Sequence, residues 1–263
     1  ATGAAVLTTA PTTIDTSDMR NNTASNGGAV YATGTQAITV TDSLLINNSA
    51  TSNFGGAIFA STPQLAVERT SFSGNSAAIN GGGIVHNNNS AEALLTVTDS
   101  WLDSNSAGFR GGGIFLTDTP AATIERNTFT DNSAAGTSGG AIYLQGPNTP
   151  YTATISNNTF LSNAGAPGTA IYAASADSTV YVDYNTIARN EGNAGANPAL
   201  FADQATMILS NTILSDNTDN SGPANCGGNI ISSGYNIEAT DSCNLTANGD
   251  QPNTDPLLLN PVY

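Results

Sequence analysis

The residues whose types and spacing come closest to a chemical site are four acids on neighbouring turns of a repeat: Asp99, Asp103, Glu125 and Asp131. Paired carboxylates can supply general acid and base catalysis in glycan cleavage. Carboxylates that share a face can also hold Ca²⁺. However, the calcium-binding repeat Gly-Gly-x-Gly-x-Asp does not occur. A solvated acidic surface is therefore the preferred interpretation, with no cofactor, and Ca²⁺ stays open as the alternative; no residue is assigned as a metal ligand.

The other candidate catalytic residues are scattered. The single histidine, His86, falls in a column that is otherwise Ala and Leu, which is typical of a packed residue rather than a base. Arg110 and Arg189 lie on different turns, so they do not form a site together. The sequence contains no nucleophile elbow, P-loop or dinucleotide-binding fingerprint. We therefore expect no catalytic residues and no enzymatic activity.

The charge composition excludes several classes of partner. The 263 residues include 5 Arg, no Lys and 20 Asp or Glu, for a net charge of −15. A nucleic-acid-binding protein needs many cations to displace phosphate counterions, and binding to an anionic membrane surface has the same requirement. No apolar run approaches the roughly 18 residues of a membrane span. Nucleic acids and membrane-spanning segments are therefore not expected.

The elements that would position these residues are defined by an internal repeat. A Gly-Gly-Ala-Ile-Tyr type string recurs at steps of 26 to 30 residues. Its branched residue falls at Val30, Ile58, Ile84, Ile114, Ile142, Ile171, Leu200 and Ile230. A second column is β-branched throughout, at Ile14, Val40, Val67, Val97, Ile124, Ile155, Val182 and Ile208. Residues that prefer pleated, half-buried positions are thus placed in register from turn to turn.

This pattern predicts an all-β fold, a right-handed single-stranded parallel β-helix with about eight coils of ~28 residues and three short strands in each coil. Residues 1–230 would form the coils, the first of them incomplete, and residues 231–263 an irregular tail packed on the last coil. A propeller is disfavoured because its blades need four antiparallel strands and hairpin turns.

Polar columns follow the same repeat. Asn127, Asn158, Asn185 and Asn211 are predicted to form a ladder whose amides bond along the stack. In the column one position earlier, the charge alternates in sign through Asp42, Arg69, Asp99 and Arg126. That alternation predicts exposed ion pairs between coils, each worth little. Both columns are interpreted as structural.

One apolar column has no such simple interpretation. In the string Gly139 to Gln145, Ile142 and Leu144 share one face and Tyr143 and Gln145 the other. The Gln145 column is polar across the repeat, so this second face is expected to lie outside the coil. It would expose a stacked binding ladder of Tyr31, Phe59, Phe115, Tyr143, Tyr172 and Phe201. The alternative is an inverted strand whose aromatic residues fill the core.

Both ends of the repeat carry a further expectation. The string at Ala4, Val6 and Leu7 matches the later Gly-Gly-Ala-Val strings, so the chain begins within a coil. That start predicts an open sheet edge for assembly, or else a chain that was processed or trimmed. Cys226 and Cys243 are expected to form a disulfide worth about 3 kcal/mol, the alternative being two free thiols.

The pairing of Gly139-Gly140-Ala141-Ile142 with Phe129-Thr130-Asp131-Asn132 resembles the repeat of the chlamydial polymorphic outer-membrane proteins. The string Asn253-Thr254-Asp255-Pro256-Leu257 resembles the end of secreted bacterial "choice-of-anchor" β-helix proteins. The resemblance implies a β-helix displayed at the cell surface, often as an adhesin.

The functional expectation follows from the resemblance and the ladder together. It is an extracellular structural or adhesive β-solenoid, secreted or on the cell surface, that self-associates into filaments or binds a cell-surface or glycan partner. The alternative is a carbohydrate-active β-helix, either a lyase or hydrolase or a glycan-binding module.

Overall fold

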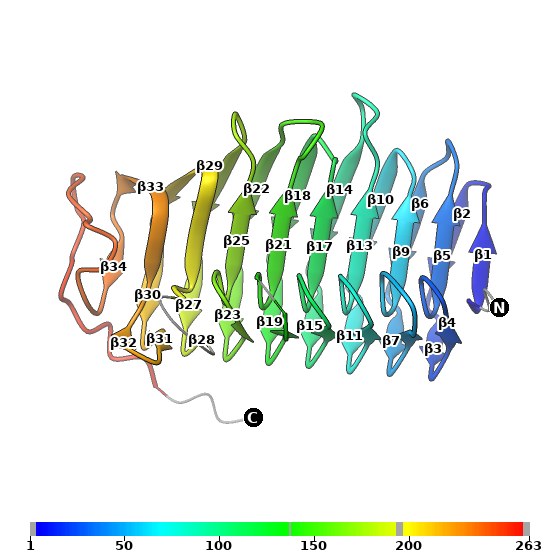
Figure 1. Ribbon diagram of the computed structural model, residues 1–263, viewed down its shortest axis with the longest axis horizontal. Helices are drawn as coiled ribbons and strands as arrows, with labels where there is room; N and C mark the ends of the chain where they lie inside the picture. The colour runs from blue at the N-terminus through cyan, green and yellow to red at the C-terminus, as the bar shows by residue number, and fades with distance from the viewer. Residues whose placement is uncertain (1–3, 137, 193–196, 260–263) are drawn as a thin grey trace.

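The computed structural model describes residues 4–136, 138–192 and 197–259. Residues 1–3 of the predicted coil region and residues 260–263 of the predicted tail lie outside this description. The chain winds into an elongated coil in which equivalent strands of successive turns lie side by side (Figure 1). Each regular turn contributes four short strands, which we call the first to fourth rows. The predicted parallel β-helix of about eight coils is confirmed. The two-residue strand of the fourth row was not predicted, because two residues are too few to show a period.

The strands of the rows have the following bounds. The first row contains β1 (Val6–Thr8), β5 (Val30–Thr33), β9 (Ile58–Ser61), β13 (Ile84–Asn87), β17 (Ile114–Thr117), β21 (Ile142–Gln145) and β25 (Ile171–Ala174). The second row contains β2 (Thr12–Asp15), β6 (Ile38–Thr41), β10 (Gln64–Glu68), β14 (Leu94–Thr98), β18 (Ala121–Glu125), β22 (Thr152–Ser156) and β26 (Thr179–Asp183).

The remaining rows form the other two sheets. The third row contains β3 (Asp18–Arg20), β7 (Leu44–Ile46), β11 (Ser71–Ser73), β15 (Trp101–Asp103), β19 (Thr128–Thr130), β23 (Thr159–Leu161), β27 (Thr186–Ala188), β30 (Ile213–Ser215) and β34 (Ile237–Glu238). The fourth row contains β4 (Thr23–Ala24), β8 (Ser49–Ala50), β12 (Ser76–Ala77), β16 (Ser106–Ala107), β20 (Ser133–Ala134), β24 (Ala164–Gly165), β28 (Glu191–Gly192), β31 (Thr218–Asp219) and β32 (Gly222–Pro223).

The long strand β29 (Leu200–Ser210) joins the first and second rows, and β33 (Cys226–Gly234) pairs with β29; together these strands form one 16-stranded sheet. The third and fourth rows form two nine-stranded sheets. Every pairing is parallel except that of β31 with β32. Coil pairing continues past residue 230, because β33 and β34 still pair with β29 and β30. Regular pairing therefore extends to Glu238, beyond the boundary expected from the repeat.

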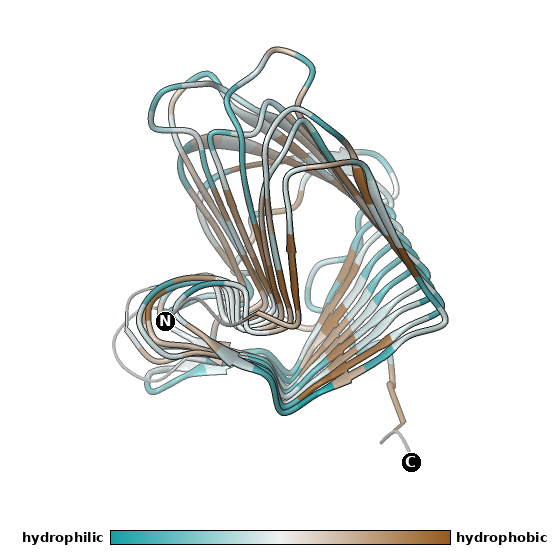
Figure 2. Cartoon of the chain, turned by 90° about the vertical axis from the view of Figure 1, so that its right-hand side faces the viewer, coloured by the Kyte–Doolittle hydropathy of each residue, from teal (hydrophilic) through white to brown (hydrophobic). Residues whose placement is uncertain are grey.

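The register places β-branched residues directly above one another in the core. Val97 pairs with Val67 on one side and with Ile124 on the other, and all three are buried. The prediction for Ile208 is wrong, because Leu209 pairs with Val182 and takes the buried position. Seen along the axis, the strands enclose an interior, and hydrophobic positions recur along them from coil to coil (Figure 2). The buried residues of these strands form the core.

Left-handed backbone conformations make the corners between rows. The corner between the second and third rows has φ between 46° and 56° at Thr16, Asp42, Arg69, Asp99, Arg126, Asn157, Tyr184 and Asn211. Before the first row the equivalent residue is the first glycine of the Gly-Gly string, such as Gly111 with φ of 63°. A Cβ on Gly111 would also collide with the carbonyl oxygen of Ile114. Glycine is therefore required at this corner.

Candidate functional site

The aromatic ladder occupies the outer face of the first row. Tyr143 pairs with Phe115 on one side and with Tyr172 on the other, while Ile142 and Leu144 of the same strand are fully buried in the coil core. The predicted assignment of faces is therefore correct, and the inverted strand is excluded. Neighbouring rings stack, with centroids 4.7 Å apart for Tyr143 and Tyr172 and 5.2 Å for Tyr31 and Phe59. The ladder ends at Phe201, because Gly227 is the next residue in register.

The predicted exposure of the ladder is wrong for its central members. Tyr143 is only 5% exposed, and Phe115 and Tyr172 are also buried. These residues form a hydrophobic cluster separate from the coil core, and Phe59 and Phe201 pack against its two ends. Tyr31, Phe59 and Phe201 are half-buried, so the ends of the ladder are more accessible than its middle.

The ladder is covered by loop residues that precede the Gly-Gly strings. We call Phe54, Asn80, Arg110 and Ser138 the covering column, since their backbones pair with one another in this order. Phe54 packs on Phe59, with ring centroids 6.4 Å apart. The guanidinium carbon of Arg110 lies 5.1 Å from the centre of the Tyr143 ring, within cation–π range. This column could not be predicted from the sequence, because its four residues share no residue type.

Burial also changes the acidity of the ladder hydroxyls. Desolvation raises the pKa of Tyr143 and that of Tyr172. The hydroxyl of Tyr172 donates to Oδ2 of Asp203 at 2.9 Å, which raises its pKa further. Both tyrosines therefore stay neutral hydrogen-bonding groups at physiological pH.

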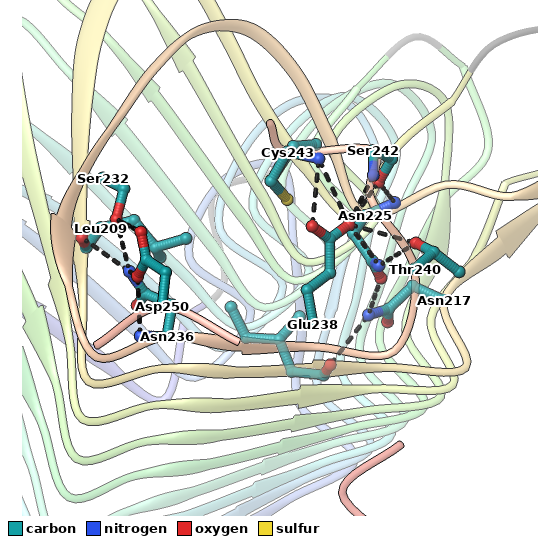
Figure 3. Close-up of a disulfide and its surroundings, with 12 residues drawn as sticks. Leu209, Asn217, Asn225, Ser232, Asn236, Glu238, Thr240, Ser242, Cys243 and Asp250 are labelled. Carbon is teal, nitrogen blue, oxygen red and sulfur yellow. Dashed lines mark hydrogen bonds between the residues drawn. A yellow bond between two sulfur atoms is a disulfide. The ribbon is translucent and has the colours of Figure 1, made fainter. Parts of the chain in front are cut away.

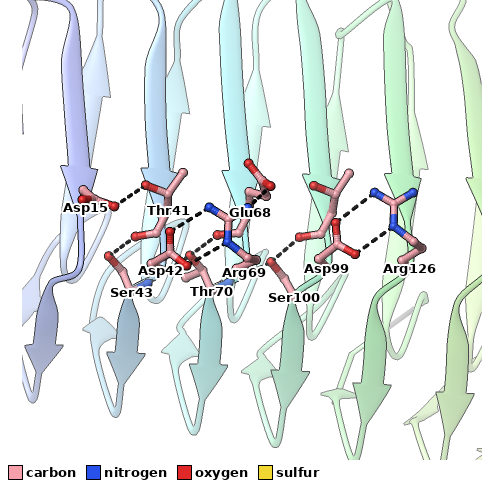
Figure 4. Close-up of polar contacts among 11 residues, drawn as sticks. Asp15, Thr41, Asp42, Ser43, Glu68, Arg69, Thr70, Asp99, Ser100 and Arg126 are labelled. Carbon is pink, nitrogen blue, oxygen red and sulfur yellow. Dashed lines mark hydrogen bonds and ion pairs between the residues drawn. The ribbon is translucent and has the colours of Figure 1, made fainter.

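The four acids of the expected acidic group separate into two pairs. Arg126 binds Asp99 at 2.8 Å (Figure 4) and Glu125 at 2.6 Å. Asp103 accepts a hydrogen bond from Thr130 at 2.6 Å. Burial and the charge of Asp103 together raise the pKa of Asp131. Among the residues that the structure describes, no ion pair forms to Asp103 or Asp131. These two acids lie beside the exposed ring of Trp101, whose indole N–H donates to Thr130.

The ion pairs between coils form at the predicted corner. Arg69 binds Asp42 through two hydrogen bonds of 2.8 Å, and Arg126 binds Asp99 in the same way (Figure 4). Arg69 also pairs with the adjacent Glu68. Hydrogen bonding to the guanidinium lowers the pKa of Asp42 and that of Asp99. All of these groups lie at the surface, so they contribute little to stability.

His86 is a packed residue, as expected. Its Nε2 lies 2.8 Å from the carbonyl oxygen of Thr62, and its Nδ1 lies 3.0 Å from Oγ1 of Thr119. A carbonyl oxygen only accepts, so Nε2 carries the proton and Nδ1 accepts from the threonine hydroxyl. Burial lowers the pKa of His86 to about 4. The neutral ring is fully buried and does not reach solvent.

The predicted asparagine ladder forms at three of its four positions. Asn127 donates to Oδ1 of Asn158 at 3.1 Å, and Asn158 donates to Asn185 at 3.1 Å. The prediction for Asn211 is wrong, because this residue occupies the left-handed corner between the second and third rows. Thr212 takes the ladder position, with its hydroxyl oxygen accepting from the backbone N–H of Asn185. The cause is the one-residue register difference that also places Leu209 rather than Ile208 in the core.

The cysteines form the expected disulfide between Cys226 and Cys243. Beside it lies Glu238, a fully buried carboxylate that the sequence analysis missed. Oε1 of Glu238 accepts hydrogen bonds from Asn225 and Thr240 at 2.9 and 3.1 Å and from the backbone N–H of Ser242 at 2.9 Å (Figure 3). We call the segment from Glu238 to the disulfide, residues 238–243, the C-terminal clamp.

The predicted assembly edge is formed by β1. This strand pairs with β5 on one side, and no second pairing partner occurs in residues 4–136, 138–192 and 197–259. Leu7 is 63% exposed, whereas Val6 packs against the core and Ala4 is half-buried. Within the same ranges, no group of three or more His, Cys, Asp or Glu side chains could hold a metal ion.

The geometry and the comparisons with known proteins agree on the class. The chain matches the family described as "Right handed beta helix region" over residues 2–129 and 108–252. It therefore belongs to the right-handed β-helix family. No curated protein and no solved structure matches it. Among the described residues, no helix has the length and apolar character needed to cross a membrane.

Proposed function

We propose that this chain is an extracellular, non-enzymatic β-solenoid that acts in adhesion or in a surface structure through the outer face of its first row. One observation carries the proposal. The aromatic ladder forms a second hydrophobic cluster outside the coil core, although the core already buries the inward faces of the first, second and third rows. The end members Tyr31, Phe59 and Phe201 are only half-buried, and accessible apolar surface of this kind is where a partner would bind.

Two further features support this proposal. A disulfide is typical of proteins in oxidising, extracellular environments. The repeat resembles those of secreted bacterial surface proteins, in which the β-helix is displayed to its surroundings. The partner is then a cell surface or its glycans, or a second copy of the chain. No cofactor is needed for such a role.

The experiment that tests this proposal measures binding of the labelled protein to intact bacterial and animal cells. Replacing the half-buried Phe59 by Ser should reduce binding at least fivefold. The control is Tyr184→Ser, which removes a more exposed aromatic ring from the corner between the second and third rows. Sedimentation at high concentration reports on self-association in the same samples. A protein that neither binds cells nor self-associates would contradict the proposal.

A carbohydrate-active enzyme is the second candidate, and one observation favours it. Asp103 raises the pKa of Asp131 beside the exposed ring of Trp101. Such a pair of carboxylates, one of them more easily protonated, could act as acid and base on a glycan stacked on the ring. Release of reducing or unsaturated ends from pectin or alginate, lost in Asp131→Asn, would establish this activity. Activity unchanged in that variant would exclude this pair as its source.

A further inference from the structure

The aromatic ladder is interrupted at one rung. Val85 pairs with Phe59 on one side and with Phe115 on the other, so a valine stands between two aromatic rings. The covering column changes on the same coil, where it presents Asn80 between Phe54 and Arg110. A cavity of about 150 Å³ lies at this rung. Its lining consists of Phe54, Phe59, Asn80, Val85, Asn87, Phe115, Thr117 and Gln145. We call this cavity the Val85 slot.

One polar atom of the Val85 slot lacks a partner. Asn80 is only 8% exposed, and its Oδ1 accepts no hydrogen bond from any residue that the structure describes. The neighbouring polar groups are already engaged, since Gln145 donates to Oγ1 of Thr117 at 3.1 Å. A buried acceptor without a donor is destabilising, so native proteins rarely retain one without a reason. Because Oδ1 itself has almost no accessible surface in this structure, a ligand hydroxyl would supply the missing donor once the Asn80 amide turns toward the slot.

We infer that the Val85 slot binds one neutral sugar ring of a surface glycan. This inference rests on the proposed adhesive function and names its ligand class. The rings of Phe59 and Phe115 would face the C–H surfaces of the sugar, and Oδ1 of Asn80 would accept one of its hydroxyl groups. Asn87 lies at the same cavity and offers a further amide group to the remaining hydroxyls.

The separation of the two rings favours a sugar over an aromatic ring. Phe59 and Phe115 are two strands apart, which corresponds to roughly 9.6 Å. A flat ring in van der Waals contact with both walls needs only about 7.5 Å, at ~3.7 Å on each side. A puckered ring with axial hydrogens is thicker and fills the additional space. The size of the cavity also suits a single ring rather than a drug-sized ligand.

The charge of the site favours a neutral sugar. None of the eight lining residues is ionisable. The neighbouring guanidinium of Arg110 is already engaged with the ring of Tyr143 and with Oε1 of Gln145, so the lining itself offers no charge to pair with a uronic acid or a sulfate. The net charge of −15 would in addition repel an anionic glycan. The lining also offers no carboxylate that could act as a general acid, so the slot would bind the ring without cleaving it.

The test uses the full chain and the methyl glycosides of galactose, glucose, mannose and N-acetylglucosamine as probes. Saturation-transfer NMR and shifts of the phenylalanine ring signals report binding. We expect millimolar affinity for at least one probe and none for galacturonate. Val85→Phe, which fills the slot and completes the ladder, should weaken binding at least tenfold with an equal or higher melting temperature. Asn80→Leu, which removes the unpaired acceptor, should also weaken binding at least tenfold with an equal or higher melting temperature. Asn89→Ala, on an exposed loop position, is the matched control and should bind like the wild type.

The outcomes separate this inference from the proposed function. Absence of binding to all four glycosides, or binding that survives in both Val85→Phe and Asn80→Leu, would overturn the inference. If the labelled protein still adheres to cells in that case, the adhesive function stands and uses another part of the ladder. If a glycoside binds but cells do not, the inference stands, whereas the adhesive function is wrong.

Discussion

Asn105 donates a hydrogen bond from Nδ2 to Oδ1 of Asn132, 3.0 Å away on the next coil. Its own Oδ1 accepts from the backbone N–H of Asn75 at 3.1 Å, on the preceding coil. A second proton of Nδ2 goes to the carbonyl oxygen of Phe72. Each amide of this buried ladder therefore joins three successive coils, and the column continues from Asn48 to Asn217.

Replacing Asn105 by Ala should lower the free energy of unfolding by about 2–4 kcal/mol, because the buried backbone N–H of Asn75 loses its acceptor and the carbonyl of Phe72 loses this donor. Urea denaturation monitored by circular dichroism measures the change. Asn229→Ala is the control, since Asn229 makes one exposed hydrogen bond, to Thr206. Equal stability losses in the two variants would show that the ladder contributes nothing beyond an ordinary surface amide.

Features that recur in register from coil to coil could be predicted from the sequence, whereas features that depend on how loops pack could not. Stacked columns such as Val97 and Ile124 are visible because every coil places the same residue type at the same step. Covering of the ladder by Phe54, Asn80 and Arg110 depends on where a loop folds back, and no period records this. The predicted exposure of Tyr143 was therefore wrong, although the predicted face of its strand was right. Glu238 was missed for the same reason, since its donors come from Asn225 and from the tail.

A charge placed in the coil core should be strongly destabilising. Val97→Asp would bury a carboxylate between Val67 and Ile124 with no cation near it. We expect a loss of roughly 3 kcal/mol or more. Thr96→Asp is the matched control, since Thr96 precedes it on the outward face of the same strand. Thermal unfolding compares the two, and a Val97→Asp protein that melted like Thr96→Asp would show that this column is not core.

The free energy of unfolding should decrease as the pH is lowered, because His86 is buried in its neutral form. Burial lowers the pKa of His86 to about 4 in the folded chain, against about 6.5 in the unfolded chain. The unfolded chain therefore takes up the proton first, so this contribution is complete above pH ~6.5 and is lost as the pH falls toward about 4. The difference amounts to roughly 3 kcal/mol.

The control for this pH dependence is His86→Leu, because Leu116 occupies the same position on the next coil. Free energies of unfolding at pH 7.5 and 4.5 should differ less in this variant than in the wild type, and the carboxylates that titrate in both proteins cancel in the comparison. The same pH dependence in both proteins would mean that His86 is not buried in its neutral form.

The C-terminal clamp should open locally when the disulfide is removed. Cys243 donates its backbone N–H to both carboxylate oxygens of Glu238 at 3.2 Å, and the disulfide ties this segment to β33. In the variant with Cys226→Ser and Cys243→Ser, the loop of about 17 residues loses a constraint worth roughly 3 kcal/mol. Amide hydrogen exchange at residues 238–243 should then accelerate at least tenfold. Exchange in β9 and β13, several coils away, is the internal control and should stay unchanged, because in a solenoid each coil contacts only its neighbours. Acceleration of equal size in all of these strands would show instead that the disulfide stabilises the whole coil.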